Sequence, residues 1–210
     1  MQEETKFVKK KVLSKTKSIR GYILPNNSLQ ISMIGIFTAL NFAITFWLQI
    51  PIPATGGYIN IGDVAVMFTA LLFGPIIGGI AGGLGPMLAD IFSLYGFYAP
   101  ATLVIKGIEG FLIGFISNPK DCEGRVSYRD IIAVLVGGCL IPFGYFIYEA
   151  FILNFGVLVA IVEVPGNFFQ FGFAASVSIL LILASRKNII EGLPQVFNKI
   201  FIPTDVENIK

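Results

Sequence analysis

Four ionisable side chains lie within one long apolar stretch of this chain, residues 61–110. They are Asp63, Asp90, Lys106 and Glu109, and the residues around them are largely aliphatic or glycine. Carboxylate and ammonium groups in such surroundings can bind a polar ligand, carry ions or pair with one another. If the stretch lies in a bilayer, each of these groups is costly to bury and is a candidate for a functional site.

The composition of the chain indicates an integral membrane protein. Of its 210 residues, 55% are hydrophobic and 13% are charged, and the mean hydropathy is +0.78. Soluble domains contain about 25% charged residues. The 20 Phe and 23 Gly suit helices that pack closely in lipid. The length allows one helical bundle and no separate soluble domain.

Several classes of chemistry are excluded by what the sequence lacks. It contains no histidine, and its two cysteines, Cys122 and Cys139, lie in a polar segment and in an apolar segment. We therefore expect no metal site, no cofactor and no disulfide. The chain also has no phosphate-binding loop of the G-x-x-x-x-G-K-[ST] type. Nucleic acid is not an expected partner.

Six apolar segments predict an all-α fold, a bundle of six transmembrane helices. The second segment is short for the hydrocarbon core of a bilayer, which requires about 20 helical residues. Pro75 is placed to begin the third helix, and Pro86 and Pro142 to kink the third and fifth. The predicted spans are 32–50, 61–73, 76–95, 101–116, 131–155 and 164–184.

The positive charges predict the orientation of this bundle. Every Lys and Arg except Lys106 lies before the first span, between the fourth and fifth spans, or after the sixth. The three opposite loops contain none, and their only charged residue is Glu163. By the positive-inside rule, both termini are cytoplasmic. The predicted organisation is a basic tail at 1–30, a substrate-binding bundle at 31–186 and a C-terminal tail at 187–210.

This orientation places the polar groups of five helices in the outer half of the membrane. The simplest alternative is local pairing, for example between Lys106 and Glu109, which lie three residues apart on one helix face. A pocket open to the outside explains better why the groups gather at one depth. The predicted polar lining is Asp63, Asp90, Lys106, Glu109, Glu149, Asn154, Asn167 and Gln170, and the tyrosines predicted to stack on a flat heterocycle are Tyr58, Tyr95 and Tyr98.

Small residues form a second pattern. Gly35, Ala39 and Ala43 recur every four residues along the first span. Such stripes let helices approach closely, so this one serves either packing within the bundle or docking of another protein. In the third span, the glycine pairs Gly78/Gly82 and Gly79/Gly83 have the same spacing and favour internal packing.

The segment GYINIGDVAVMFTALLFGPIIGGIAGGLGPMLAD, followed by YAPATLVIKGIEGFLIG, resembles the substrate-binding S components of energy-coupling factor (ECF) vitamin transporters. The resemblance covers all six predicted spans and is strongest to the riboflavin and hydroxymethylpyrimidine branch. Ala39 and Ala43 match the Ala-x-x-x-Ala motif through which S components contact the transmembrane T component.

The resemblance implies a subunit of a prokaryotic plasma membrane importer, with a T component and two ATPases as partners. It implies capture of a small vitamin or vitamin precursor on the outer side, followed by toppling of the S component in the bilayer during ATP turnover. The loop at 51–60 would act as a lid, with Gly56 and Gly57 as a hinge.

Three other functions share features with this sequence. An intramembrane aspartyl protease could use Asp63 and Asp90, but the Gly-x-Gly-Asp motif of that family loses its first glycine here, where Asn60 stands. We therefore expect no enzyme. A stand-alone permease for a small solute and a structural membrane subunit without a ligand remain as alternatives.

Overall fold

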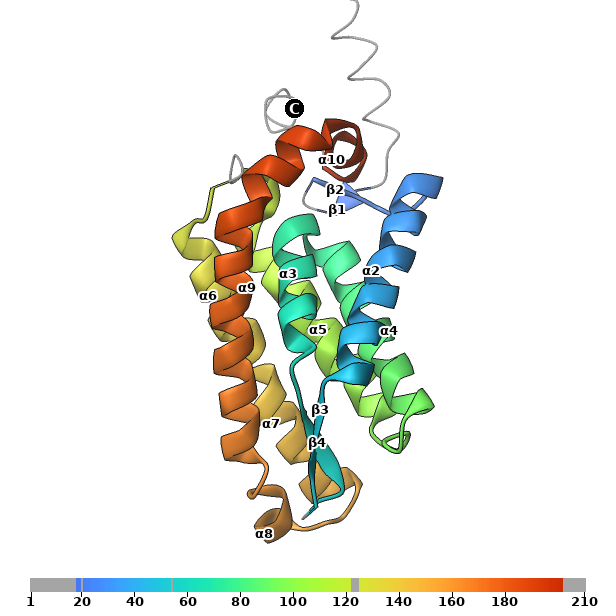
Figure 1. Cartoon of the computed structure of the whole chain (residues 1–210), viewed down its shortest axis with the longest axis vertical. Coiled ribbons are helices and arrows are strands. Elements are labelled where there is room, and N and C mark those ends of the chain that lie inside the picture. Colours follow the sequence, from blue (N-terminus) through green and yellow to red (C-terminus); the bar gives the residue numbers. More distant parts are fainter. Residues whose placement is uncertain (1–17, 20, 54, 122–124, 202–210) are drawn as a thin grey trace, which may run out of the picture.

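Helices make up most of the structure, and the longer ones run along one axis of the molecule (Figure 1). The structure is a computed structural model, and it describes residues 18–19, 21–53, 55–121 and 125–201. The helices are α2 (Ser28–Trp47), α3 (Asp63–Phe73), α4 (Pro75–Phe92), α5 (Ala99–Ser117), η1 (Pro119–Asp121), α6 (Tyr128–Gly138), α7 (Leu140–Ile147), the π-helix η2 (Tyr148–Ile152), α8 (Val157–Ala160), α9 (Val164–Gly192) and α10 (Pro194–Ile200).

Two short antiparallel hairpins add to these helices, so the described fold is mostly helical rather than purely α. Strands β1 (Ser18–Ile19) and β2 (Tyr22–Ile23) pair at one end of the bundle. Strands β3 (Gln49–Ile52) and β4 (Gly57–Asn60) pair at the other end. The loop predicted at 51–60 is therefore largely a β-hairpin.

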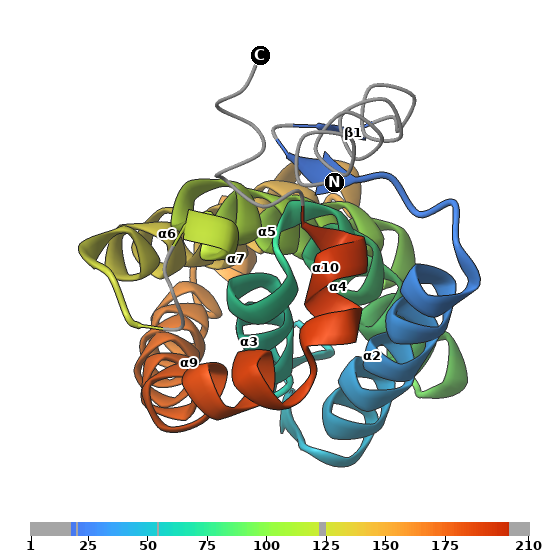
Figure 2. The same ribbon diagram turned by 90° about the horizontal axis from the view of Figure 1, so that it is seen from above.

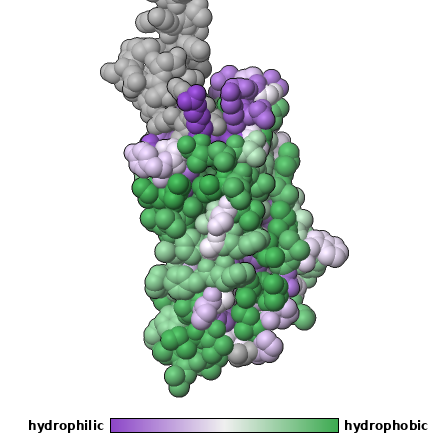
Figure 3. All heavy atoms as spheres, turned by 60° about the vertical axis from the view of Figure 1, so that its left-hand side comes forward, coloured by the Kyte–Doolittle hydropathy of each residue, from purple (hydrophilic) through white to green (hydrophobic). Residues whose placement is uncertain are grey.

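Five helical segments of the described chain are long and apolar enough to cross a membrane, and α3 is a shorter apolar helix. The five segments are α2, α4, α5, the run from α6 to η2, and the run from α8 to α9. On the face shown in Figure 3, hydrophobic side chains cover most of the length of the molecule, and hydrophilic residues gather near the end where α10 lies.

The short helix α3 lies in the middle of the bundle (Figure 2). It packs against α2, α4, α5 and α9, and nine of its eleven residues are buried. Val66, Met67, Ala70 and Leu71 have no exposed surface. Because other helices surround it, α3 needs no polar face. Its residues after Asp63 are apolar except Thr69, whose hydroxyl donates to the backbone oxygen of Ala65.

Glycine allows α4 and α5 to touch through their backbones, as predicted for the third span. A Cβ on Gly110 would lie 2.3 Å from the carbonyl oxygen of Gly78, and a Cβ on Gly83 would lie 2.9 Å from that of Leu103. On the side of α4 that faces α3, a Cβ on Gly82 would lie 2.8 Å from Val66. The turn before α4 is also confirmed. Gly74 has a φ of 83°, a conformation that favours glycine, and Pro75 is the first residue of the helix.

Three predicted spans differ most from the observed helices. The sixth continues as α9 to Gly192 instead of ending at residue 184. The first ends at Trp47 instead of continuing to residue 50, because the chain turns into β3. The fifth is divided into α6, α7 and η2. Pro142 lies at the start of α7 and cannot donate a backbone hydrogen bond, which accounts for the break near Cys139.

The ends of the described chain meet at one end of the bundle. Tyr22 is buried beside Phe201, their rings 5.4 Å apart, and the two residues form a β-bridge. The Tyr22 hydroxyl donates to Asn118 Oδ1 at 2.9 Å. Helix α10 covers the same end, and its Val196 and Phe197 are buried. The farther parts of the predicted tails, 1–17 and 202–210, lie outside the described residues.

Candidate functional site

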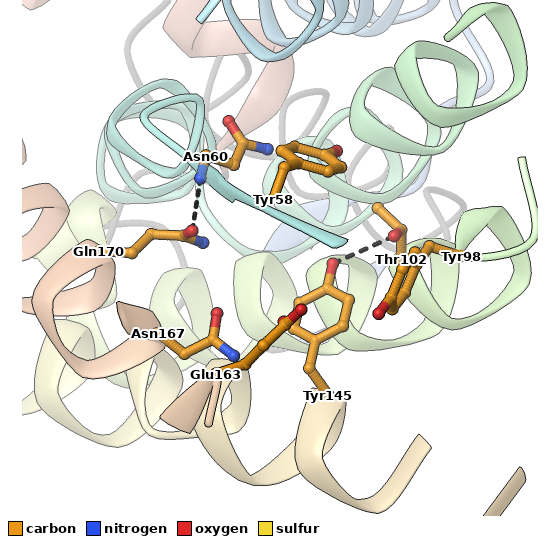
Figure 4. A pocket seen from close by; sticks show the side chains of 8 residues that line it. All are labelled: Tyr58, Asn60, Tyr98, Thr102, Tyr145, Glu163, Asn167 and Gln170. Carbon is orange, nitrogen blue, oxygen red and sulfur yellow. Dashed lines mark hydrogen bonds between the residues drawn. The ribbon is translucent and has the colours of Figure 1, made fainter. Parts of the chain in front are cut away.

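A small pocket opens at the end of the bundle covered by β3 and β4. The space between its lining atoms, part of it open to solvent, is about 310 Å³. Figure 4 shows that polar and aromatic side chains from β4, α5, α7 and α9 converge on it. Its lining is Tyr58, Asn60, Tyr98, Thr102, Tyr145, Glu163, Asn167 and Gln170.

Helical periodicity gathers most of these side chains into stripes. On α5, Thr102, Lys106 and Glu109 lie at positions i, i+4 and i+7, which share one helix face. Along α9, the same spacing joins Glu163, the residue that caps the helix, to Asn167 and Gln170. All six side chains are at most 4% exposed. Two polar stripes on otherwise apolar helices therefore face the same interior region.

A network of charges and amides closes the deep side of the pocket. Lys106 forms an ion pair with Asp63 and a longer one with Glu109, with 3.4 Å between Lys106 Nζ and Glu109 Oε2. Gln170 Nε2 donates to Asp63 Oδ2 at 2.5 Å, and Gln170 Oε1 accepts from the backbone N–H of Asn60 at 2.5 Å. Strand β4 is thereby tied to α3, α5 and α9.

Tyr58 connects the hairpin to α4. Its hydroxyl donates a short hydrogen bond to Asp90, and its ring packs against Tyr95 with 4.4 Å between centroids and a 39° tilt. Tyr58 thereby acts as a hydrogen-bond donor that joins β4 to α4.

The outer rim of the pocket contains a pair of carboxyl groups. Tyr98 donates to Glu149 Oε1 at 3.0 Å, and the carboxyl groups of Glu149 and Glu163 lie within interaction distance of each other. Glu149 belongs to the π-helix η2. A π-turn changes the helical register and is common at functional sites. In this π-helix the Glu149 side chain is fully buried.

The hairpin approaches this rim very closely. A Cβ on Gly57 would lie 2.4 Å from Glu163 Oε1 and 2.9 Å from the Tyr98 hydroxyl. A side chain at position 57 would therefore require the ends of the Glu163 and Tyr98 side chains to move. Gly56, the other residue of the predicted hinge, has a φ of 67° and forms the turn.

The hydroxyl groups of Thr102 and Tyr145 form the remaining wall and are 3.1 Å apart. Lys106 Nζ lies 5.8 Å from the centroid of the Tyr145 ring, within the range of a cation–π interaction. The ammonium group is thus held by carboxylates on one side and by an aromatic face on the other.

The predicted site residues fall into three groups. Tyr58, Tyr98, Asn167 and Gln170 line the pocket. The second group lies behind this lining and contacts either the lining or the charged network below it. Its members are Asp63, Asp90, Tyr95, Lys106, Glu109 and Glu149. Asn154 is different. It is exposed in the turn after η2, with a φ of 55°, and is not among the lining residues.

Four lining residues were not predicted as site residues: Asn60, Thr102, Tyr145 and Glu163. The i, i+4 relation of Thr102 to Lys106 and of Tyr145 to Glu149 was a usable signal, because it places each pair on one helix face. Glu163 was recognised as the only charged residue of the outer loops. It was not included among the pocket residues, although it lies four residues before Asn167.

A second concave surface lies between α2 and α4. It is apolar, and its lining is Ile31, Ile34, Gly35, Thr38, Ala39, Phe42, Leu84, Leu88 and Phe92. Gly35 and Ala39 are exposed, and no atom lies within 4 Å of a Cβ built on Gly35. Ala43 is half-buried. Gly35 and Ala39 of the first span therefore do not pack within the described bundle.

The two aspartates of the protease alternative have separate partners. Asp63 is held by Lys106 and Gln170, and Asp90 by Tyr58. In a catalytic aspartate pair, two adjacent carboxyl groups share a proton. The arrangement of Asp63 and Asp90 differs from such a pair.

Three comparisons bear on this geometry. The model of a family described as ECF-type riboflavin transporter, S component, matches residues 26–187. An uncharacterized protein of Pyrococcus woesei is 44% identical over 101 residues, which cover 48% of this chain and 65% of the relative. The thiamine precursor transporter HmpT of Lactococcus lactis is 29% identical over 135 residues, or 64% of this chain and 75% of that protein.

The fold has a match among solved structures. The crystal structure of an S component for biotin from an ECF-type ABC transporter superposes with a TM-score of 0.56 and 20% sequence identity. The superposition covers 79% of this chain and 94% of that structure.

Proposed function

The chain belongs to the family of ECF-type riboflavin transporter S components, and we propose that it captures a small vitamin or vitamin precursor outside the cell for ATP-driven uptake by partner subunits. Family and fold are those of transporter S components, not of enzymes. The observation that carries the proposal is the polar and aromatic pocket enclosed at one end of an apolar bundle.

A heterocyclic ligand suits the chemistry of this pocket. The rings of Tyr58, Tyr98 and Tyr145 provide flat faces for stacking, and the amides of Asn167 and Gln170 provide directional hydrogen bonds. The related proteins are named for riboflavin, a thiamine precursor and biotin, which differ in size and charge but all contain a heterocycle.

The hairpin β3–β4 is placed to act as the lid of this pocket. Tyr58 and Asn60 line the pocket from β4, so opening the hairpin would remove part of the binding surface. Its contacts with the bundle include the hydrogen bonds of Tyr58 with Asp90 and of Asn60 with Gln170, and the close approach of Gly57 to Glu163. Ligand entry then requires these contacts to break and re-form.

The bundle would cross a prokaryotic plasma membrane six times, with α3 and the hairpin forming the short second crossing. Both ends of the described chain lie at the end opposite the pocket, as an even number of crossings requires. The basic segment at 1–30 and the segment at 187–210 would then flank the bundle in the cytoplasm, and the pocket would face outward.

The groove between α2 and α4 is the surface we assign to the T component. Gly35 and Ala39 are open to the outside of the bundle, so a helix of another protein could approach the α2 backbone closely. The T component would in turn connect this subunit to two ATPases, which supply the energy for uptake.

The test begins with native mass spectrometry of the detergent-purified protein and identification of any released ligand. Uptake is then measured in proteoliposomes containing this chain with a T component and both ATPases, with and without ATP. We expect uptake only with the complete module and ATP. Uptake by the chain alone would instead support a permease, and a protein that neither binds nor transports any vitamin would support a structural subunit.

A further inference from the structure

The end of the bundle that contains the pocket is apolar on its outer surface. Helix α8 lies at this end, beyond the start of α9 (Figure 1), and its Leu158 is 85% exposed. Val157 on the same helix, and Ile161 and Val162 directly after it, are each about half exposed. On the face shown in Figure 3, hydrophobic side chains extend to the tip of the molecule opposite α10. The apolar surface therefore covers this end as well as the sides of the bundle.

Exposed apolar side chains also border the mouth of the pocket. Leu94, in the turn between α4 and α5, is 92% exposed. Phe97, in the same turn, is exposed beside the lining residue Tyr98, with 4.7 Å between the ring centroids. In the segment before α9, the exposed Val162 directly precedes the lining residue Glu163. The polar pocket thus opens between two apolar segments of chain.

The loops at this end lack the charged groups that suit contact with bulk water. In the sequence, the segments 48–60, 93–98 and 153–163 contain one charged residue, Glu163, and its side chain is buried. The opposite end of α9 differs, because Lys187 and Glu191 are exposed there and form an ion pair. Charged residues are normally the most exposed class at a surface that faces water. The outer end is therefore built for a less polar environment.

The length of α9 indicates the depth of this end in a bilayer. From Val164 to the exposed Lys187, the helix extends for about 34 Å, slightly more than the hydrocarbon core of about 30 Å. With the Lys187 ammonium group at the cytoplasmic surface, Val164 reaches the outer edge of the hydrocarbon, and α8 lies at the level of the headgroups. A tilt of α9 would bring α8 deeper. Trp47, 78% exposed at the end of α2, is a residue type enriched at this level.

We propose that the outer end of the bundle is embedded in the interface of the outer leaflet, with Leu94, Leu158 and Ile161 in contact with lipid, so that the pocket opens among the headgroups and not into bulk water. Apolar segments without charge bind such an interface through the apolar area that they bury. Lipid is the occupant that the geometry favours, because this surface adjoins the sides of the bundle that the same bilayer covers. The proposal rests on the membrane crossing of the bundle and holds for any ligand of the pocket.

Tryptophan fluorescence tests this placement, because Trp47 is the single tryptophan of the chain. Trp47→Phe is combined with either Leu158→Trp or, as the control at an exposed position of the opposite end, Glu191→Trp. The proteins are reconstituted in phosphatidylcholine nanodiscs, and quenching is measured with lipids brominated near the headgroup end of the acyl chain and with aqueous iodide. We expect the tryptophan at position 158 to be quenched at least about twofold more by brominated lipid, and at least about twofold less by iodide, than the one at position 191.

Three results would overturn the inference. Equal iodide quenching at positions 158 and 191 would place the outer end in water. Shielding of position 158 from both quenchers, in nanodiscs that contain two copies, would assign the surface to a second copy of the chain. In the wild-type protein, which needs no new tryptophan to fold, quenching of Trp47 by iodide but not by brominated lipid would also contradict it. Each of these results leaves vitamin capture intact, and loss of ligand binding and uptake with the expected quenching would overturn only the proposed function.

Discussion

Arg186 on α9 forms two charge-assisted hydrogen bonds with Asp130 on α6, from Nη1 to Oδ2 at 2.8 Å and from Nη2 to Oδ1 at 2.9 Å, and neither side chain is exposed. The guanidinium also donates to the backbone oxygens of Leu71 at 2.8 Å and Arg125 at 3.0 Å. A single side chain thus joins α3, α6 and α9 at the end of the bundle opposite the pocket.

Replacing this arginine should reduce stability without reducing ligand affinity. Arg186→Met removes the partner of a buried carboxylate, a change that costs about 3–5 kcal/mol. We expect a clearly lower unfolding temperature in detergent and an affinity within about twofold of wild type for whichever compound binds. Lys187→Met, at the next and exposed position, is the control and should change neither. Loss of affinity at normal stability would show that this cluster acts on the pocket.

Lys106 is expected to matter for both stability and binding. Lys106→Met leaves Asp63 and Glu109 without their cation, so binding should become undetectable and the unfolding temperature should fall. Combining it with Asp63→Asn and Glu109→Gln removes the uncompensated charges and should recover much of the stability. If the triple variant also recovers binding, the ammonium group is not part of the recognition of the ligand.

The close approach of the hairpin to the rim predicts that Gly57→Ala impairs closure. The added Cβ would lie 2.4 Å from Glu163 Oε1, so either β4 or Glu163 must move. We expect at least about tenfold weaker ligand binding, mainly through faster dissociation. Gly172→Ala on α9 is the control, because nothing lies within 4 Å of its added Cβ. Equal dissociation rates in the two variants would argue against the hairpin as a lid.

Docking of the T component is tested by Ala39→Trp. Ala39 is exposed in the groove between α2 and α4, so the large side chain would block an approaching helix without disturbing the core. Co-purification with the T component and ATP-dependent uptake should both be lost, while ligand affinity stays within about twofold of wild type. Ile147→Trp, an exposed apolar position on α7, should retain both activities.

Composition and turn residues were sufficient to predict much of the fold. The observed helices begin or end within a few residues of most predicted spans, because long apolar runs and the Gly74-Pro75 turn are strong local signals. The hairpin β3–β4 was not predicted. Its pairing depends on contacts such as Asn60 with Gln170 on a distant helix, which the local sequence does not reveal.

The functions of individual charged residues were harder to predict. The sixth span was predicted to end at residue 184, just before Arg186, since a charge after an apolar run usually marks the membrane surface. In the structure α9 continues to Gly192, and Arg186 is fully buried beside Asp130. Local sequence shows that a charge is present, but its partner lies in the first turn of α6, 56 residues earlier in the chain. That these polar groups bind a ligand remains a prediction.

The shortness of α3 has a consequence for how this protein enters the membrane. Its eleven residues extend for about 16 Å, roughly half of the hydrocarbon thickness. A helix of this length, with Asp63 at its start, is a poor substrate for insertion by itself. The tight turn at Gly74 joins it directly to α4, so we expect the translocation machinery to release the two helices into lipid as one hairpin, with Asp63 neutralised only after α5 delivers Lys106.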